Sequence, residues 1–289
     1  MHKLNISIVG CGYIGKKVAN RLPAIGEAAE CYVHSQRSKE NCESLGLSVH
    51  LLELDSSECA NEWQSKEENI IAYFVPPPRY GVTDTRIANF ISVLKNSHKL
   101  PHKIVLISTT GVYGDCKGEW IDETRAVNPQ ADRAHRRLSA ERQLQQFCKL
   151  KDIKCIIFRV PGIYAMDKLP IERISSGEPI VQAIDSGYTN RIHADDLTEF
   201  CIEALTRNVK SGIYNCCDGH PSTMNDYFMC VADALKLERP KEISLQQAKE
   251  ELSAGMLSYL AESKRISNNK LLDNFTTKLK YPNLQSALQ

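Results

Sequence analysis

The stretch Leu4–Gly15, with the sequence LNISIVGCGYIG, decides the fold of this 289-residue chain. Its first half is a short apolar run rich in β-branched residues, which is typical of a strand. Gly10, Gly12 and Gly15 follow as Gly-x-Gly-x-x-Gly. In a strand–turn–helix unit the first glycine permits a tight turn, the second a close approach of a ligand to the backbone, and the third close packing of the helix on the strand.

A helix is predicted directly after these glycines. Ile14, Val18 and Leu22 recur at i, i+4 and i+8, and Pro23 ends the pattern. The N-terminus of such a helix points at the loop, where it attracts phosphate groups. The stretch therefore predicts a dinucleotide-binding loop, the alternative being a glycine-rich turn without a ligand. The residues predicted to bind the dinucleotide here are Gly10, Gly12, Tyr13, Ile14 and Gly15.

Strand-like runs alternate with helical patterns through the first half of the chain. Such alternation predicts βαβ units and, with right-handed crossovers, an α/β fold with a doubly wound parallel sheet of the Rossmann type. The expected strands are Leu4–Val9, Cys31–His34, Val49–Leu54, Asn69–Val75, Lys103–Ile107 and Ile153–Arg159.

The regular alternation of strand-like and helical patterns ends after Arg159. Glycines and prolines interrupt residues 166–190, which favours loops and short helices there, whereas 195–207 is again amphipathic and precedes a short strand at Ile213–Cys216. The C-terminal part reads as helical and charged. We therefore expect a dinucleotide-binding domain made of residues 1–164 and 192–218. A smaller, mostly helical substrate lobe is expected from 165–191 and 219–289.

Composition excludes several classes of protein. Lys plus Arg number 36 and Asp plus Glu 35, so the net charge of +1 argues against nucleic acid as a partner. The longest strongly apolar run, Ile70–Val75, is too short to cross a membrane. The eleven cysteines are scattered without a Cys-x-x-Cys or a zinc-site spacing, so no metal is predicted. An apolar strand at the very start leaves no room for a signal peptide, and we expect a reducing, cytoplasmic location.

The end of the second strand indicates which dinucleotide binds. NAD sites usually place a carboxylate there to bond the ribose 2′-hydroxyl. Residues 33–38 read VHSQRS and contain no carboxylate, whereas Ser35 and Arg37 can donate to a 2′-phosphate. The sequence therefore favours NADP, with NAD as the second choice. Alternatively, Arg37 is a solvated loop residue.

Several further motifs follow the glycine loop in a fixed order: Leu54–Ser56, Ile107–Gly114, Arg159–Tyr164, Arg191–Leu197 and Gly212–Asn215. Together with the glycine loop, they resemble the NAD(P)-dependent epimerase/dehydratase family, the extended or atypical short-chain dehydrogenase/reductases. The resemblance implies that Asp55 lies against the adenine. It also implies cofactor contacts from Val75 and Pro76 after the fourth strand, from Ser108 after the fifth, and from Pro161.

The chemistry of this family needs a Ser or Thr, a Tyr and a Lys. Thr109 falls at the hydroxyl position, where it would orient a substrate oxygen. Counting back from the pair Ala140-Glu141 puts Arg133 at the tyrosine position and Arg137 at the lysine position. Arg137 can replace the lysine in binding ribose. Arg133 cannot replace a tyrosine chemically, because a guanidinium does not release its proton near pH 7.

Another side chain must therefore exchange the proton, if the chain is an enzyme. Tyr113 and Tyr164 are the first candidates, since each follows the carboxyl end of a predicted parallel strand, where ligands bind. His135 and His193 are further candidates, although a structural role in its own turn is favoured for His193. Arg133 and Arg137 would recognise a carboxylate or phosphate of the substrate, or else form solvated ion pairs with Glu141 along the helix.

These observations predict an NAD(P)-dependent oxidoreductase or epimerase/dehydratase. It would act by hydride transfer on a small polar substrate, either anionic or a sugar nucleotide. The alternative is a non-catalytic NADP(H)-binding redox sensor or regulatory protein, which the missing Tyr and Lys favour. The partner expected is thus a small molecule, with neither nucleic acid nor membrane. The resemblance also implies a homodimer formed through helices at about 83–97 and 130–149.

Overall fold

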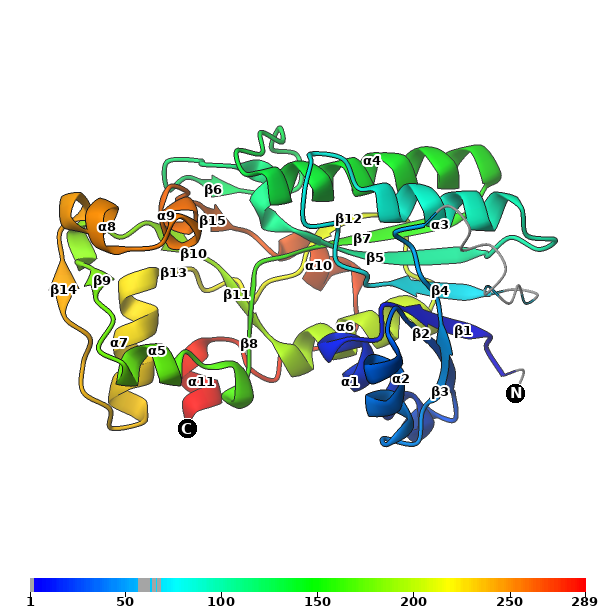
Figure 1. Ribbon diagram of the computed structural model, residues 1–289, viewed down its shortest axis with the longest axis horizontal. Coiled ribbons are helices and arrows are strands. Elements are labelled where there is room, and N and C mark those ends of the chain that lie inside the picture. Colours follow the sequence, from blue (N-terminus) through cyan, green and yellow to red (C-terminus); the bar gives the residue numbers. More distant parts are fainter. Residues whose placement is uncertain (1–2, 57–62, 64–65, 67–68) are drawn as a thin grey trace.

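The computed structural model describes residues 3–56, 63, 66 and 69–289 (Figure 1). Its centre is a seven-stranded parallel sheet with the strand order β12-β7-β5-β4-β1-β2-β3. This confirms the doubly wound parallel sheet. The strands of the sheet are β1 (Ile6–Val9), β2 (Ala29–Val33), β3 (Ser48–Leu51), β4 (Ile70–Tyr73), β5 (Lys103–Thr109), β7 (Lys154–Val160) and β12 (Gly212–Asn215).

The strands agree with the sequence patterns apart from their ends. β1 and β4 are buried along their whole length, because a parallel sheet is covered on both faces and needs apolar side chains on both. The predicted strand Val49–Leu54 is too long, since pairing with β2 ends at Leu51. β5 is longer than predicted and continues to Thr109, which still pairs with Val160 of β7.

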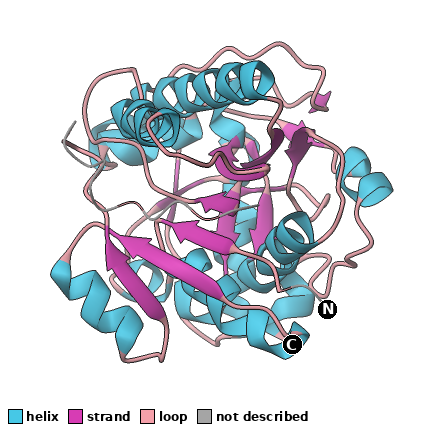
Figure 2. Cartoon of the chain, turned by 90° about the vertical axis from the view of Figure 1, so that its right-hand side faces the viewer, coloured by secondary structure: helices cyan, strands magenta, loops and turns pink. Residues whose placement is uncertain are grey.

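Helices cover both faces of this sheet, as the side view in Figure 2 shows. One layer contains α1, α2 and α6, whose apolar residues share a core with β1, β2 and β7. The other contains α3 and α4, packed on β4 and β5. The helices of these two layers are α1 (Tyr13–Arg21), α2 (Gln36–Glu43), α3 (Thr85–Lys95), α4 (Asp132–Lys151) and α6 (Ala194–Thr206), with the 3₁₀ turns η1 (Leu22–Ile25) and η3 (Thr110–Tyr113).

The remaining elements lie beyond the carboxyl ends of the strands, on the left of Figure 1. Residues 165–191 and the C-terminal part pair with each other in two small sheets, β10–β13 and β9–β14. These elements are β9 (Ile180–Val181), β10 (Tyr188–Thr189), β13 (Ser222–Thr223), β14 (Glu242–Ile243), η4 (Met166–Lys168), η5 (Ala183–Asp185), α5 (Ile171–Ser175), α7 (Met224–Ala234), α8 (Leu245–Glu251), α9 (Ala254–Leu260) and α11 (Leu284–Leu288). The exception is α10 (Asn269–Asn274), which packs beside β12 at the core of the sheet.

Two further strand pairs join distant parts of the chain. β8 (Gly162–Tyr164) pairs with β11 (Arg191–His193), and β6 (Trp120–Ile121) pairs with β15 (Arg265–Ile266). The second pair brings the segment around residue 264 against the loop that follows β5. This long-range contact contributes one wall of the site described below.

The order of the strands reverses between β1 and β4. From β1 the chain proceeds outward to β2 and β3, whereas β4 begins the series that leads to β12. The loops after β1 and β4 diverge at such a point and leave a crevice, in which ligands of open α/β sheets bind. The cofactor loop predicted from the sequence lies at this crevice.

Candidate functional site

Three cavities follow one another along the carboxyl edge of the sheet. The first, which we call the rim cavity, measures about 260 Å³ and lies between the ends of β1, β2 and β4. The second, the glycine-loop cavity, measures about 320 Å³ and shares Gly10, Gly12 and Phe74 with the first. The third, the lobe cavity, measures about 310 Å³ and is closed by residues of the C-terminal part. The lobe cavity has no lining residue in common with the other two, but its Pro77 directly follows Pro76 of the rim cavity in the chain, so it borders them.

The glycine loop shapes the first two cavities. Gly10 has φ +88°, and a Cβ there would lie 2.5 Å from the backbone nitrogen of Val75, so glycine is needed to let the two loops meet. A Cβ on Gly12 would meet nothing closer than the Gly10 carbonyl oxygen at 4.0 Å, so this glycine leaves space for a ligand rather than for the protein. Tyr13, Ile14 and Gly15 line the glycine-loop cavity as predicted.

The N-terminus of α1 has free backbone donors that could bind an anion. Gly12 is its N-cap residue, and within the described chain no side chain caps this end or places a carboxylate in the first turn. The backbone N–H groups of a helix start need acceptors, and phosphate oxygens satisfy them well. The residues present therefore fit the pyrophosphate of a dinucleotide.

Tyr13 marks the other end of this cavity. Its hydroxyl donates a hydrogen bond of 2.7 Å to Asp167, and the Lys168 ammonium lies over its ring at 4.7 Å. Partial burial and the Asp167 carboxylate raise the pKa of Tyr13 above its ordinary value. The side chain thus remains a neutral phenol and ties the glycine loop to η4.

The rim cavity contains some of the residues predicted to bind the adenosine half. Val75 and Pro76 line it, together with His34 and Ser38. Ser35 does not line it, because its hydroxyl caps α2 and accepts from the Ser38 backbone N–H at 3.3 Å.

Two other predicted contacts of this half also lie outside the cavity lining. Arg37 is exposed on α2. The Asp55 carboxylate makes a bidentate ion pair with Arg86, with both distances 2.6 Å, which lowers the pKa of Asp55. Arg86 lines the cavity in its place, so Asp55 acts here by holding that guanidinium.

The first wall of the lobe cavity carries four of the predicted site residues. Thr109, Arg133, Arg137 and Pro161 line it together. The Thr109 hydroxyl accepts from the Gly111 backbone N–H at 3.1 Å and caps η3, which fixes the loop in place. The structure thus brings together side chains from the ends of β5 and β7 and from the first turns of α4.

The two arginines differ in their surroundings. Arg137 donates to the Val75 carbonyl at 3.0 Å and so connects α4 to the loop after β4. Burial lowers the pKa of Arg137, and the nearby Asp84 opposes this. Arg133 stacks on the Tyr259 ring of α9, with its guanidinium carbon 4.2 Å from the ring centre.

Glu141 has another partner than the predicted one. It forms a buried ion pair of 2.7 Å with Arg159, and the Ser108 hydroxyl donates to the same carboxylate at 2.5 Å. The interpretation of Arg133, Arg137 and Glu141 as a solvated ion-pair series is therefore wrong. Ser108 lies behind the cavity wall, not on it, and supports Thr109 from the core side.

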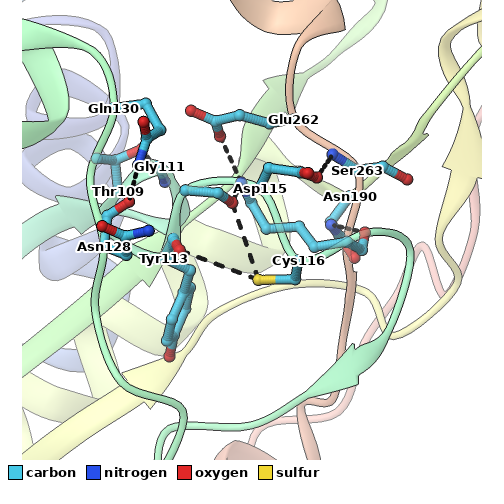
Figure 3. Close-up of polar contacts among 12 residues, drawn as sticks. Thr109, Gly111, Tyr113, Asp115, Cys116, Asn128, Gln130, Asn190, Glu262 and Ser263 are labelled. Carbon is cyan, nitrogen blue, oxygen red and sulfur yellow. Dashed lines mark hydrogen bonds and ion pairs between the residues drawn. The ribbon is translucent and has the colours of Figure 1, made fainter.

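The two tyrosines favoured as proton donors point away from the lobe cavity. Tyr113 is 1% exposed and its hydroxyl donates to Asn215 at 2.8 Å; Figure 3 shows its ring directed away from Thr109 and Glu262. Burial raises the pKa of Tyr113 to about 12. Tyr164 is 2% exposed, and its ring meets the edge of His193. Neither hydroxyl lines the described cavities, so the structure gives neither a place for proton exchange with a ligand there.

The structural role expected for His193 is confirmed. Its Nδ1 accepts from the Asp195 backbone N–H at 3.1 Å and caps α6. Burial lowers the pKa of His193, which favours the neutral ring that such a cap requires.

The second wall of the lobe cavity was missed by the sequence argument. It comes from residues on two segments, 188–190 and 259–264. No local motif in the sequence marks these residues, although Glu262 and Lys264 are charged residues directly before β15. These lining residues are Tyr188, Thr189, Asn190, Tyr259, Glu262 and Lys264.

The crevice and the glycine loop can now be compared with known proteins. A model of the NAD dependent epimerase/dehydratase family matches residues 6–217. The chain belongs to this family. The resemblance read from the sequence motifs is thereby confirmed, and a nicotinamide dinucleotide is the cofactor that the family and the crevice share. No curated protein matches the sequence.

Solved structures with the same fold cover nearly the whole chain. A functionally unknown conserved protein from Silicibacter pomeroyi DSS is 24% identical with a TM-score of 0.82, over 98% of this chain and 96% of that one. The UDP-glucose 4-epimerase of Thermus thermophilus, in complex with NAD, is 19% identical with a TM-score of 0.76, over 99% and 96%. The UDP-glucuronic acid 4-epimerase of Bacillus cereus, also with NAD, is 15% identical with a TM-score of 0.75, over 99% and 96%.

The described residues contain neither a membrane-spanning helix nor a metal-binding cluster. None of the helices is long and apolar enough to cross a membrane. No group of three or more His, Cys, Asp or Glu side chains is arranged to hold a metal ion. The described cysteines are free thiols, and Cys59 lies outside the described residues.

Proposed function

We propose that the chain is an NAD(P)-dependent oxidoreductase or epimerase/dehydratase that acts by hydride transfer on a small polar, anionic substrate. The observation that carries this proposal is the succession of the three neighbouring cavities: a dinucleotide laid over the glycine loop from the rim cavity would extend toward the lobe cavity. When bound, the nicotinamide supplies a hydride donor or acceptor there. Thr109 would orient the substrate oxygen next to it.

Charge and size support a small anionic substrate over a sugar nucleotide. Arg133, Arg137 and Lys264 line the lobe cavity, against Glu262 as its single carboxylate among the described lining residues. The volume of about 310 Å³ is at the lower end of the roughly 300–1,000 Å³ typical of ligand pockets, and it must also admit the nicotinamide.

The proposed cofactor preference is NADP, with NAD as the second choice. β2 ends at Val33, and the cavity-lining residues that follow are His34 and Ser38, which can donate to a 2′-phosphate. Glu53 also lines the rim cavity, but its carboxylate accepts from the Asp55 backbone N–H at 2.8 Å. Arg37 is near enough in sequence to approach a phosphate that projects from the cavity.

The competing proposal is a non-catalytic NADP(H)-binding redox sensor. The replacement of the family's Tyr and Lys by Arg133 and Arg137 favours it, since neither arginine can exchange a proton. The sensor would bind the dinucleotide without turnover, whereas the enzyme would consume NADPH in the presence of a carbonyl compound. We further propose a cytoplasmic location and a homodimer through α3 and α4, the latter tested by light scattering.

Thermal shift with NADPH, NADP, NADH and NAD in parallel tests the cofactor assignment. A ligand at 100 times its dissociation constant stabilises the native state by about 2.7 kcal/mol, a shift that is easily measured. NADPH oxidation across a panel of carbonyl compounds then separates enzyme from sensor. If none of the four dinucleotides shifts the melting temperature, both proposals fail together.

A further inference from the structure

Lys264 and Glu262 form a nearly buried ion pair on the second wall of the lobe cavity. Their side chains are 7% and 13% exposed, and both line the cavity. The Lys264 ammonium donates to the Glu262 carboxylate and, at 2.7 Å, to the Gly114 carbonyl. Figure 3 shows Glu262 on the same side of the loop as Thr109 and Gly111, opposite the Tyr113 ring. The pair thus faces the space in which Thr109 would orient a substrate.

An ammonium group has three protons to donate. Among the described residues, the Gly114 carbonyl and the Glu262 carboxylate accept two of them. Since Lys264 lines the cavity, we infer that a ligand there accepts the third. The two protein contacts fix the position of the nitrogen, so no side-chain freedom has to be lost when a ligand oxygen arrives.

The alternative role for Lys264 is to hold the C-terminal segment against the loop after β5. Its neighbours already make that connection. The Ser263 backbone N–H donates to Asp115 at 2.9 Å, Arg265 donates to the Gly118 carbonyl at 2.7 Å, and β15 pairs with β6. Desolvating two further charges is costly and adds little to such a clamp, which favours a role toward a ligand.

We propose that Lys264 is the group that exchanges a proton with the substrate oxygen, and that the substrate is a small carbonyl compound bearing a carboxylate, such as a 2-oxo acid. Glu262 is a positioning residue that holds the ammonium. Arg133, on the facing wall, supplies the positive charge for the carboxylate. The assignment rests on the proposed function, and it names a proton donor that neither Arg133 nor Arg137 can be.

The step balances in the direction of reduction. The carbonyl carbon accepts a hydride, with its electron pair, from a bound reduced nicotinamide dinucleotide, while the π electrons move to the oxygen. That oxygen takes a proton from the Lys264 nitrogen. A C–H and an O–H bond form on the substrate, while the C–H bond of the reduced nicotinamide, the carbonyl π bond and an N–H bond of Lys264 break. The nicotinamide is thereby oxidised and the carbonyl reduced to an alcohol, and the neutral amine regains its proton from water. Oxidation follows the same path in reverse.

Three full-length variants separate proton exchange from binding and from folding. Lys264→Arg keeps the positive charge and the donors but cannot release a proton near pH 7. The double variant Glu262→Gln/Lys264→Met removes both charges and leaves no unpaired buried ion. Arg265→Gln is the matched control, since Arg265 bonds the same loop but does not line the lobe cavity.

The probe is oxamate, an unreactive analogue of a 2-oxo acid, titrated calorimetrically with and without NADP. We expect the double variant to bind it at least about tenfold more weakly than the unchanged protein, the effect of one lost charge-assisted hydrogen bond. Arg265→Gln should bind it as the unchanged protein does. Lys264→Arg should keep oxamate binding but lose about a hundredfold or more in NADPH-dependent reduction of 2-oxo acids.

Each outcome of these measurements either supports or overturns the role proposed for Lys264. Equal oxamate affinity in the unchanged protein and a folded double variant overturns the binding role of Lys264. Undiminished reduction by Lys264→Arg overturns proton exchange, and this variant carries the test if the double variant does not fold. A protein that binds NADPH but not oxamate refutes this inference and leaves the proposed function standing. One that binds oxamate but no dinucleotide refutes the proposed function and with it proton exchange by Lys264, and leaves only the role of Lys264 in binding the anion.

Discussion

Replacing Gly12 by alanine tests the cofactor loop without disturbing the fold. Apart from the adjacent residues, the added methyl would have the Gly10 carbonyl oxygen, 4.0 Å away, as its nearest protein neighbour, and the backbone at Gly12, with φ −84° and ψ −147°, is not left-handed. Since the protein has room for this methyl, the free energy of unfolding should change by less than about 0.5 kcal/mol. The melting temperature without ligand should move by no more than about 2 °C.

Dinucleotide binding should nevertheless weaken strongly. A phosphate oxygen must come within roughly 3 Å of the backbone N–H groups at the start of α1, and the methyl would occupy that approach. Losing one charge-assisted hydrogen bond costs about 1.5–3 kcal/mol, or roughly a 10- to 150-fold increase in the dissociation constant. Titration of the protein into NADPH, followed by the fluorescence of the cofactor, measures this directly.

Gly10→Ala provides the contrast. The Cβ of the alanine would lie 2.5 Å from the Val75 backbone nitrogen, and the backbone at this position has φ +88°. The free energy of unfolding should therefore fall by several kcal/mol, because the left-handed backbone is strained for alanine and the methyl clashes with Val75. A folded Gly12→Ala protein that binds NADPH as tightly as the unchanged protein would show that the pyrophosphate does not lie over this loop. Equal destabilisation by both substitutions would refute the distinction between them.

Three further substitutions test the other assignments. Arg37→Ala should weaken NADPH binding about tenfold and leave NADH binding unchanged, as measured by the same titration; equal effects on both would make Arg37 a plain surface residue. Arg159→Met should destabilise the protein by about 3–5 kcal/mol in urea unfolding, because it leaves the Glu141 carboxylate buried and unpaired, and Glu141→Gln in the same chain should recover part of the loss. Burial raises the pKa of Asp218 to about 7, so the native state binds this proton more tightly than the unfolded chain does and stability should fall as pH rises from about 4 to 7. Asp218→Asn should remove that decline, which is at most about 4 kcal/mol, and an unchanged pH profile of unfolding in the variant would contradict the assignment.

The half of the site that binds the cofactor could be predicted because its signals are local. One contiguous stretch of the chain contains the first strand, the glycine loop and the apolar face of α1. The position of each of these segments determines where the next one begins. The loop after β5 illustrates the limit of such reasoning. Thr109 and Tyr113 are both on it, but η3 winds so that Thr109 lines the cavity while Tyr113 turns inward to Asn215. A sequence does not show which way a short turn directs its side chains.

The second wall could not be predicted for a different reason. Lys264 reaches the cavity because β15 pairs with β6, a contact between segments far apart in the chain. Neither strand has more than two residues, so there is no periodic pattern to detect. The predicted positions of Arg133 and Arg137 indicated one wall of the lobe cavity, but they could not reveal the opposite wall.

The network beneath Thr109 explains how the family's Tyr and Lys could be replaced without loss of the fold. Ser108 binds Glu141 of α4, which binds Arg159 of β7, and these buried contacts fix the end of β5 against the helix. The positions occupied by Arg133 and Arg137 are on the same helix but face the cavity, outside this network. The position of Thr109 does not depend on residues 133 and 137. These two residues could therefore become arginines that bind an anion, while the C-terminal part supplied the proton donor, Lys264. If so, Arg159→Met should impair Thr109-dependent turnover, and substitutions at 133 should alter substrate choice while leaving stability nearly unchanged.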